Sequence, residues 1–215
     1  MLPDKFAPMN VTLAMYNQYR TTFPALEVIG SMLWDTAQFT SAAVNNIQFF
    51  TTARATPDLT NLATPGMLTN NNAFLIRAFR FRTRNNPRHT ARAATTNVTT
   101  GAVDDLAQLL NSGFFRLTIA AKPYAEFPLW VMPSGCGPCG LMGVDGNTAD
   151  PGNTLDYATI GVPTQDNCFT LTQPLFIAPM VNFNVQLVWP AAITLAGGNT
   201  LLQVVFDGDL IRPVQ

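Results

Sequence analysis

Charged side chains are scarce in this chain. Asp, Glu, Lys and Arg make up 12% of its 215 residues, about half the ~25% share of a typical globular domain. Thr (26 residues) and Asn (18 residues) take their place. Neutral polar groups cost much less to remove from water than ions do, and a net charge of −1 provides little repulsion between copies. We therefore expect much of the surface to become an interface between subunits.

Cysteine, histidine and long apolar runs are also few. Three cysteines are an odd and sparse set, so the sequence implies no disulfide framework. No apolar run approaches the ~20 residues of a membrane span, and the start, MLPDKFAPMN, lacks the basic and apolar regions of a signal peptide. We expect the chain to be made and folded in a reducing cytoplasm.

One short motif carries potential redox chemistry. Cys136-Gly-Pro-Cys139 matches the dithiol of thioredoxin-like proteins, in which a helix N-terminus lowers the pKa of the first thiol. Here glycines and prolines surround the motif and leave no room for a useful helix, so a tight turn with two inert thiols is the favoured interpretation. A Cys₃His zinc site could be written from these two residues, Cys168 and His89, but it lacks the second ligand pair typical of zinc modules.

Evidence for an enzyme is weak elsewhere as well. His89 is the only histidine, so a Ser-His-Asp or Cys-His centre would have to use it. The loop carboxylates complete no calcium motif, because Ala149 replaces a ligand and no closing Glu follows. These carboxylates are Asp145, Asp150, Asp156 and Asp166. We expect no enzymatic activity, no metal and no cofactor.

Alternating apolar residues predict an all-β fold. The clearest strands are Ala73–Arg82, Phe115–Ala121, Val181–Trp189 and Leu201–Phe206. In the third of these, apolar side chains alternate with Asn and Gln, so the apolar face should line the core. Sixteen prolines and 14 glycines separate the strands, as in a sandwich or barrel. We expect one domain over residues 1–215, with one short helix near 103–110.

Three segments lack a clear period. Residues 1–45 are compatible with an extended arm, in which Met9–Gln18 forms a helix or a strand. Residues 83–100 and 133–163 are rich in polar residues or in Gly and Pro, and we expect long loops there.

Half of the basic residues fall within one short segment. Six of the twelve lie between positions 77 and 92, and no acidic residue occurs between Asp58 and Asp104. The six are Arg77, Arg80, Arg82, Arg84, Arg88 and Arg92. Such a cluster could contact the phosphates of nucleic acid or lipid, but it lacks the stacking aromatics of a nucleic-acid surface. We favour a subunit interface, in which these arginines meet the loop carboxylates of a neighbouring copy.

Several segments resemble one family. SMLWDTAQFTSAAVNNIQFFTT, LLNSGFFRLTIAAKPYAEFPLWVMPSGCG, FIAPMVNFNVQLVWP and VVFDGDLIRPVQ are similar to coat (major capsid) proteins of small tail-less icosahedral bacteriophages. The resemblance implies a single jelly roll of two four-stranded sheets, standing in an icosahedral shell around a genome, often over an internal membrane. It implies as partners copies of the same chain, a second coat or vertex protein and membrane lipid, without sequence-specific nucleic-acid binding. The implied location is the virion, assembled in the host cytoplasm.

A second function class stays open at this point. A cellular carbohydrate- or ligand-binding β-sandwich would need exposed aromatics at one end of the domain. Tyr124, Phe127 and Trp130 are the candidates, although AEFPLW is also typical of a buried strand entry.

Overall fold

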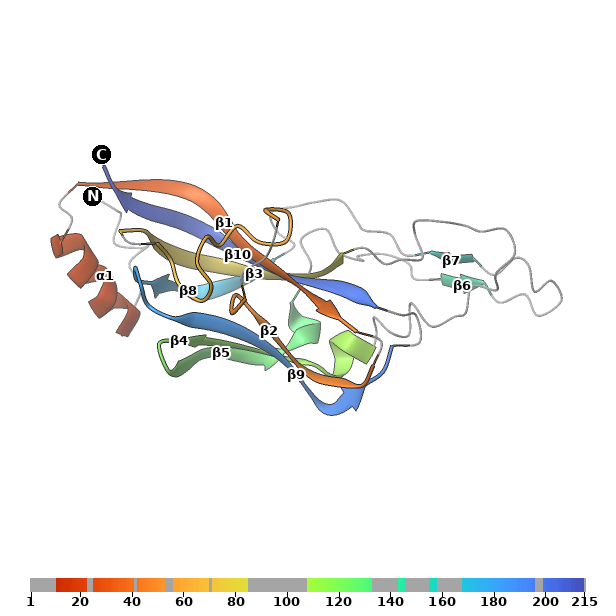
Figure 1. The fold of residues 1–215 in the computed structure, drawn as a ribbon. Helices are drawn as coiled ribbons and strands as arrows, with labels where there is room; N and C mark the ends of the chain where they lie inside the picture. The colour runs from red at the N-terminus through yellow and green to blue at the C-terminus, as the bar shows by residue number, and fades with distance from the viewer. Residues whose placement is uncertain are drawn as a thin grey trace.

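Two antiparallel four-stranded sheets pack face to face in the computed structural model of this chain (Figure 1). The structure describes residues 11–22, 25–40, 42–52, 56–69, 71–84, 108–132, 143–145, 155–157, 168–195 and 199–214. Sheet A has the strand order β1-β10-β3-β8, and sheet B has the order β2-β9-β4-β5. The predicted all-β sandwich is confirmed.

The strands of sheet A are β1 (Leu26–Phe39), β3 (Ala73–Arg84), β8 (Phe169–Ile177) and β10 (Thr200–Pro213). Those of sheet B are β2 (Val44–Phe49), β4 (Phe114–Ile119), β5 (Lys122–Pro128) and β9 (Phe183–Ile193). The other elements are α1 (Val11–Thr22), the short 3₁₀ helix η3 (Leu129–Val131), and the two strands β6 (Gly143–Asp145) and β7 (Leu155–Tyr157). α1 lies at one end of the sandwich, and β6 and β7 lie beyond the other end (Figure 1).

The order of the strands is that of a jelly roll. The first strand, β1, pairs with the last, β10, at one side of sheet A. Every connection between successive large strands crosses from one sheet to the other, except the β4–β5 hairpin, which stays within sheet B. Two Greek keys wound together produce this arrangement. The predicted single jelly roll is therefore what the chain forms.

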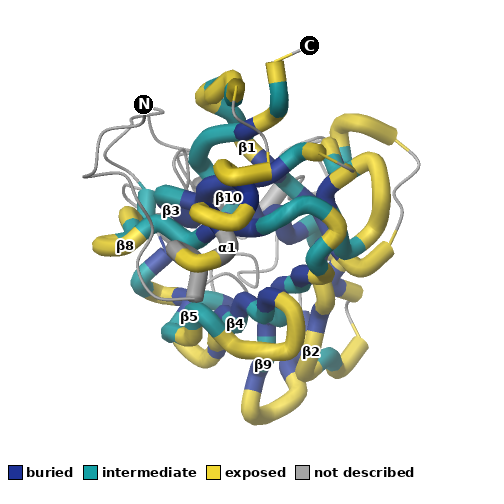
Figure 2. The backbone as a smooth tube through the Cα atoms, turned by 90° about the vertical axis from the view of Figure 1, so that its left-hand side faces the viewer, coloured by how far each residue is buried: buried dark blue, intermediate teal, exposed yellow. Residues whose placement is uncertain are grey.

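Phenylalanines from both sheets fill the space between them. The Phe206 ring of sheet A lies 5.0 Å from the Phe50 ring and 5.2 Å from the Phe79 ring, centroid to centroid. Phe79 in turn lies 5.0 Å from Phe115 of sheet B. Figure 2, which looks along the sandwich, shows buried residues in both layers. A single aromatic core thus joins the sheets.

Strand β9 has the predicted register. Phe183, Val185 and Leu187 are buried, whereas Asn184 and Gln186 between them are only partly covered. The apolar face lines the core, because successive side chains of a strand point to opposite faces of the sheet.

The N-terminal region differs from the expected extended arm. Its first described element is a helix, α1, and β1 pairs with β10 over its whole length, from Leu26 opposite Pro213 to Phe39 opposite Thr200. The sequence of β1 does not show the alternation expected of a strand in sheet A, because a carboxylate, Asp35, occupies a buried position on its core face. The Asp35 Oδ2 atom accepts a hydrogen bond from the Phe50 backbone N–H at 2.6 Å and so holds the turn after β2.

The described part of the predicted helix near 103–110 is its C-terminal end. Residues 108–112 are helical, whereas residues 103–107 lie outside the described residues. The helical segment is held from sheet B by Trp189, whose Nε1–H donates to the Leu109 carbonyl at 3.0 Å. Most of the two predicted long loops, including His89, Cys136 and Cys139, also lies outside the described residues.

Candidate interaction surfaces

A β-bulge in β3 brings a third arginine to the outer face of sheet A. The pairing of β3 with β10 shifts between Asp207 and Gly208, and Arg77 is the extra residue. Phe74 and Ile76 before the bulge and Phe79 and Phe81 after it all reach the core. An unbroken alternation would have pointed Arg77 inward with Phe79, so the bulge keeps its cation out of the core.

Gly208 makes this bulge sterically feasible. A Cβ atom at Gly208 would lie 1.9 Å from the Leu75 carbonyl oxygen and 2.9 Å from its carbon. These are backbone atoms, so no side-chain rotation could relieve the clash. The close approach of the two strands therefore requires glycine at this position.

The outer face of sheet A carries a ladder of polar pairs between β3 and β10. Arg77 forms an ion pair with Asp209, and Arg80 forms one with Asp207. Arg82 Nε donates to the Gln203 side-chain oxygen, and Gln203 Nε2 donates to Thr36 Oγ1 of β1 at 2.9 Å. The ladder thus crosses three adjacent strands and pairs both of its acids with arginines.

These contacts locate half of the predicted arginine cluster. Arg80 and Arg82 emerge on the outer face opposite Phe79 and Phe81, as the alternation predicted. Arg77 and Arg80 form ion pairs with Asp209 and Asp207 of the same chain, and the predicted contact with the loop carboxylates of a neighbouring copy stays a prediction. Sequence reasoning missed these acids because they lie more than a hundred residues away.

The remaining members of the cluster stay a prediction. Arg84 is the last residue of β3, and Arg88 and Arg92 lie outside the described residues. Asp145 and Asp156 belong to β6 and β7, whereas Asp150 and Asp166 are not described. The expected contact of these groups between subunits is not addressed by the described part of the chain.

Helix α1 covers one end of the outer face of sheet A. Tyr16 and Tyr19 pack with Phe176, Leu75 and Ile211 in a second, smaller core. The Tyr16 and Phe176 rings meet edge to face at 5.6 Å. Burial raises the pKa of both phenols above the ordinary tyrosine value, and for Tyr16 the nearby charge of Arg20 lowers it in part.

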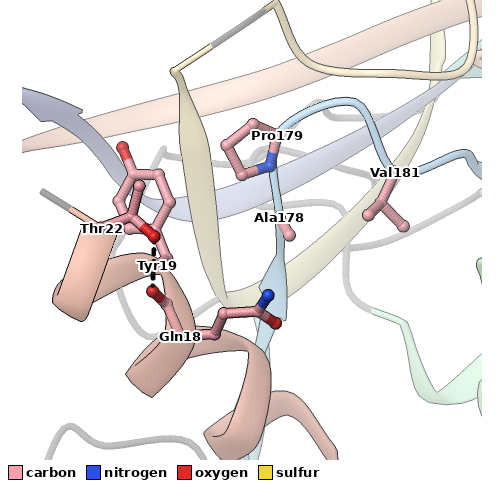
Figure 3. Close-up of a pocket in the computed structure, with 6 residues that line it drawn as sticks. All are labelled: Gln18, Tyr19, Thr22, Ala178, Pro179 and Val181. Carbon is pink, nitrogen blue, oxygen red and sulfur yellow. Dashed lines mark hydrogen bonds between the residues drawn. The ribbon is translucent and has the colours of Figure 1, made fainter.

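A shallow hollow of about 290 Å³ lies between α1 and the β8–β9 turn (Figure 3). Its lining residues are Gln18, Tyr19, Thr22, Ala178, Pro179 and Val181. The Tyr19 hydroxyl donates to the Asn71 carbonyl at 2.6 Å, and the Thr22 hydroxyl donates to the Gln18 carbonyl at 3.0 Å. With no charged group in its lining and these hydroxyls already engaged, the hollow has little with which to select a ligand.

The outer face of sheet B carries rows of mostly neutral side chains that run across all four strands. One row joins Asn46, Val188, Phe114 and Pro128 of β2, β9, β4 and β5, and the next joins Gln48, Gln186, Arg116 and Glu126. In these two rows the only charges are Arg116 and Glu126, which pair with each other at 2.7 Å. Phe114 leaves 41% of its surface exposed. These two rows can lose their water at low cost, because the one cation in them is paired with an anion.

The aromatic residues suggested for a carbohydrate site do not gather on one surface. The Phe127 ring stacks on Phe115 at 4.8 Å and packs against Phe169 at 4.5 Å, inside the sandwich. Tyr124 also packs against the main core. Only Trp130 of the three is strongly exposed, at 64%.

The described residues bring together no group of three His, Cys, Asp or Glu side chains that could hold a metal ion. The Cys168 Sγ atom lies 3.6 Å from Thr170 Oγ1. Among the described helices, none has the length and apolar character needed to span a membrane.

Comparison of the chain with protein-family models, with curated proteins and with solved structures finds no significant match to any of them.

Proposed function

We propose that this chain is a structural protein, a bacteriophage capsid subunit that assembles with copies of itself into an icosahedral shell around a genome. Its main partner is a second copy of the chain. A second coat or vertex protein and the lipid of an internal membrane are the further partners that the sequence resemblance implies. The proposed location is the virion, after assembly in the host cytoplasm.

The outer face of sheet B is the observation that carries this proposal. It is a sheet face four strands wide, with amide and apolar side chains and one internally paired arginine in its two complete rows. A protein that stays monomeric in water normally carries many charged side chains of both signs on such a face. Lectins and cupins also use jelly rolls, so the strand order alone does not select a function.

The outer face of sheet A supports the same proposal. Arg77 and Arg80 have carboxylate partners in their own chain. An anionic ligand would have to displace these carboxylates, so this part of the cluster does not act as a phosphate site. The pairing leaves a face of low net charge that a neighbouring subunit can cover.

Carbohydrate or ligand binding by a cellular β-sandwich is the alternative. It is less well supported because Phe127 and Tyr124 belong to the core, which leaves Trp130 as the one exposed aromatic of the three candidates. Stacking platforms for sugars generally need several exposed rings with polar groups between them.

Introducing one charge on the outer face of sheet B tests the proposal. Phe114→Glu should leave the subunit folded but abolish shell formation, because an unpaired carboxylate would have to be buried at each contact. The matched control is Asn17→Glu, which adds the same charge on the exposed side of α1. Light scattering of the purified proteins should show large particles for the wild type and the control only. If all three proteins assemble equally, the outer face of sheet B is not part of the subunit interface.

A further inference from the structure

The edge of sheet A formed by β1 is covered along only part of its length. Next to Trp34, the side chain of Asn61 forms hydrogen bonds to the β1 backbone that a neighbouring strand would otherwise form. Its Oδ1 accepts from the Trp34 N–H at 2.9 Å, and its Nδ2 donates to the Met32 carbonyl at 2.6 Å. Thr60 Oγ1 also donates to the Trp34 carbonyl at 2.9 Å. From Leu26 to Ser31, a segment that we call the open edge, no described residue outside β10 hydrogen-bonds the backbone.

The bonds at either end of β1 show which backbone groups point outward. The Ala25 carbonyl accepts from the Val214 N–H, so residue 25 faces β10. Met32 and Trp34 face Asn61, on the opposite side. In an antiparallel pair, successive residues direct their backbone N–H and C=O groups alternately toward the partner strand and away from it. β1 pairs with β10 without a register shift, so this alternation continues along the strand. Leu26, Val28 and Gly30 therefore direct their N–H and C=O groups away from the sheet.

The other three sheet edges carry features that protect against strand addition, namely charge, proline, short length and bulges. Strand β5 contains Lys122, Pro123 and Pro128. Strand β8 contains Pro174, and its pairing with β3 is interrupted. Strand β2 has six residues and a bulge. By contrast, β1 is 14 residues long and contains no Lys, no Pro and no bulge.

We propose that the open edge pairs with the same edge of a second copy of this chain, antiparallel and about a two-fold axis at Val28. Only this register places outward-facing residues opposite each other over the whole segment, with Val28 opposite Val28 and Leu26 opposite Gly30 of the second copy. The result is a continuous eight-stranded sheet formed from two A sheets. The inference deepens the proposed function, on which it rests, by naming one contact of the shell.

A second copy fits this edge because the segment is self-complementary. Its only charge is Glu27, which is already paired with Arg212 of β10 at 2.8 Å, so two copies bring together no uncompensated like charges. Val28, which is 39% exposed, would meet its own counterpart on the outer face. Contacts that are symmetric in this way are the usual form of two-fold interfaces.

Cysteine cross-linking tests the register. In a background with Cys136, Cys139 and Cys168 changed to Ser, Val28→Cys should form a disulfide-linked dimer on mild oxidation. The two Cα atoms would be about 5.5 Å apart, within the range that a disulfide spans. The control, Gly30→Cys, should not link to itself, because two Gly30 residues would lie four positions out of register, roughly 13 Å apart. A Cβ atom at Gly30 meets nothing within 4 Å, so the control should fold normally.

Mixing Leu26→Cys with Gly30→Cys in the same background should restore cross-linking, because these positions face each other in the proposed register. Equal linkage of Val28→Cys and Gly30→Cys would indicate random collision and overturn the proposal.

A proline substitution tests whether the contact matters for assembly. Val28→Pro removes an outward N–H from each copy and leaves the pairing with β10 intact. Val28→Thr keeps the N–H and serves as the control. We expect Val28→Pro to lose shell formation, and Val28→Thr to keep it, at equal midpoints of unfolding.

The failures of the two proposals can be told apart. Shells from Val28→Pro, or no link from Val28→Cys in a chain that forms shells, would reject the edge pairing alone. A Val28→Cys link in a chain that never forms shells would keep the edge pairing and reject the shell. A chain that neither links nor assembles would reject both. A competition experiment identifies the partner. If an unrelated strand-forming peptide suppresses the Val28→Cys disulfide more strongly than added copies of the chain without the cysteine do, the edge binds another protein and the proposal of self-pairing is rejected.

Discussion

Replacing Phe206 with Ala tests the packing between the two sheets. Phe206 is fully buried, and its ring lies 5.0 Å from Phe50, 5.2 Å from Phe79 and 6.4 Å from Phe183. Truncating a buried Phe costs ~3–5 kcal/mol through lost transfer energy and the cavity that remains. For a chain of this size, each kcal/mol lowers Tm by about 2–4 °C, so we expect Tm to fall by roughly 6–20 °C.

Phe114→Ala is the matched control, because it makes the same change on the exposed outer face of sheet B. Its effect on the free energy of unfolding should stay within ~0.5 kcal/mol. Thermal unfolding followed by circular dichroism, and urea unfolding at a fixed temperature, measure both variants. Equal losses in the two variants, or a loss below ~1 kcal/mol for Phe206→Ala, would show that the sheets do not pack through this cluster.

Three other predictions follow from single features. Gly208→Ala should destabilise the fold by more than ~1 kcal/mol in urea unfolding, because its Cβ would meet the Leu75 backbone; an unchanged midpoint would mean that the bulge is misplaced. The phenols of Tyr16 and Tyr19 have raised pKa values in the fold, so the native state holds their protons longer than the unfolded chain does. Stability from this source should be complete below about pH 10 and decline as pH rises further, and Tyr16→Phe should make the decline in urea midpoint shallower. Replacing Cys136 and Cys139 with Ser should leave assembly unchanged; an insulin-reducing activity that disappears in this variant would show a redox role.

The alternation of apolar and polar residues along the sequence was sufficient to predict the strands in which this alternation is strict. β9 and the second half of β3 carry one apolar and one polar face, so their burial could be assigned from the sequence. Side-chain alternation is a short-range signal, and it holds wherever a strand has one face in the core and one outside.

The features that sequence reasoning missed depend on distant parts of the chain. Arg80 and Asp207 are 127 positions apart, and no local signal identifies them as partners. The Asp-Gly-Asp segment that supplies both acids could have suggested a bulge, since glycine within a strand often marks one. β1 was missed because its inward-facing residues include Asp35, a buried carboxylate that accepts a hydrogen bond from the Phe50 N–H, after β2.

Electron microscopy of the purified chain tests the central claim most directly. The account predicts closed shells of uniform diameter, formed by the chain alone or on addition of a second coat protein, and lost in Phe114→Glu but not in Asn17→Glu. A chain that remains monomeric under all of these conditions, and that binds an immobilised glycan through Trp130, would contradict the shell function and favour the ligand-binding alternative.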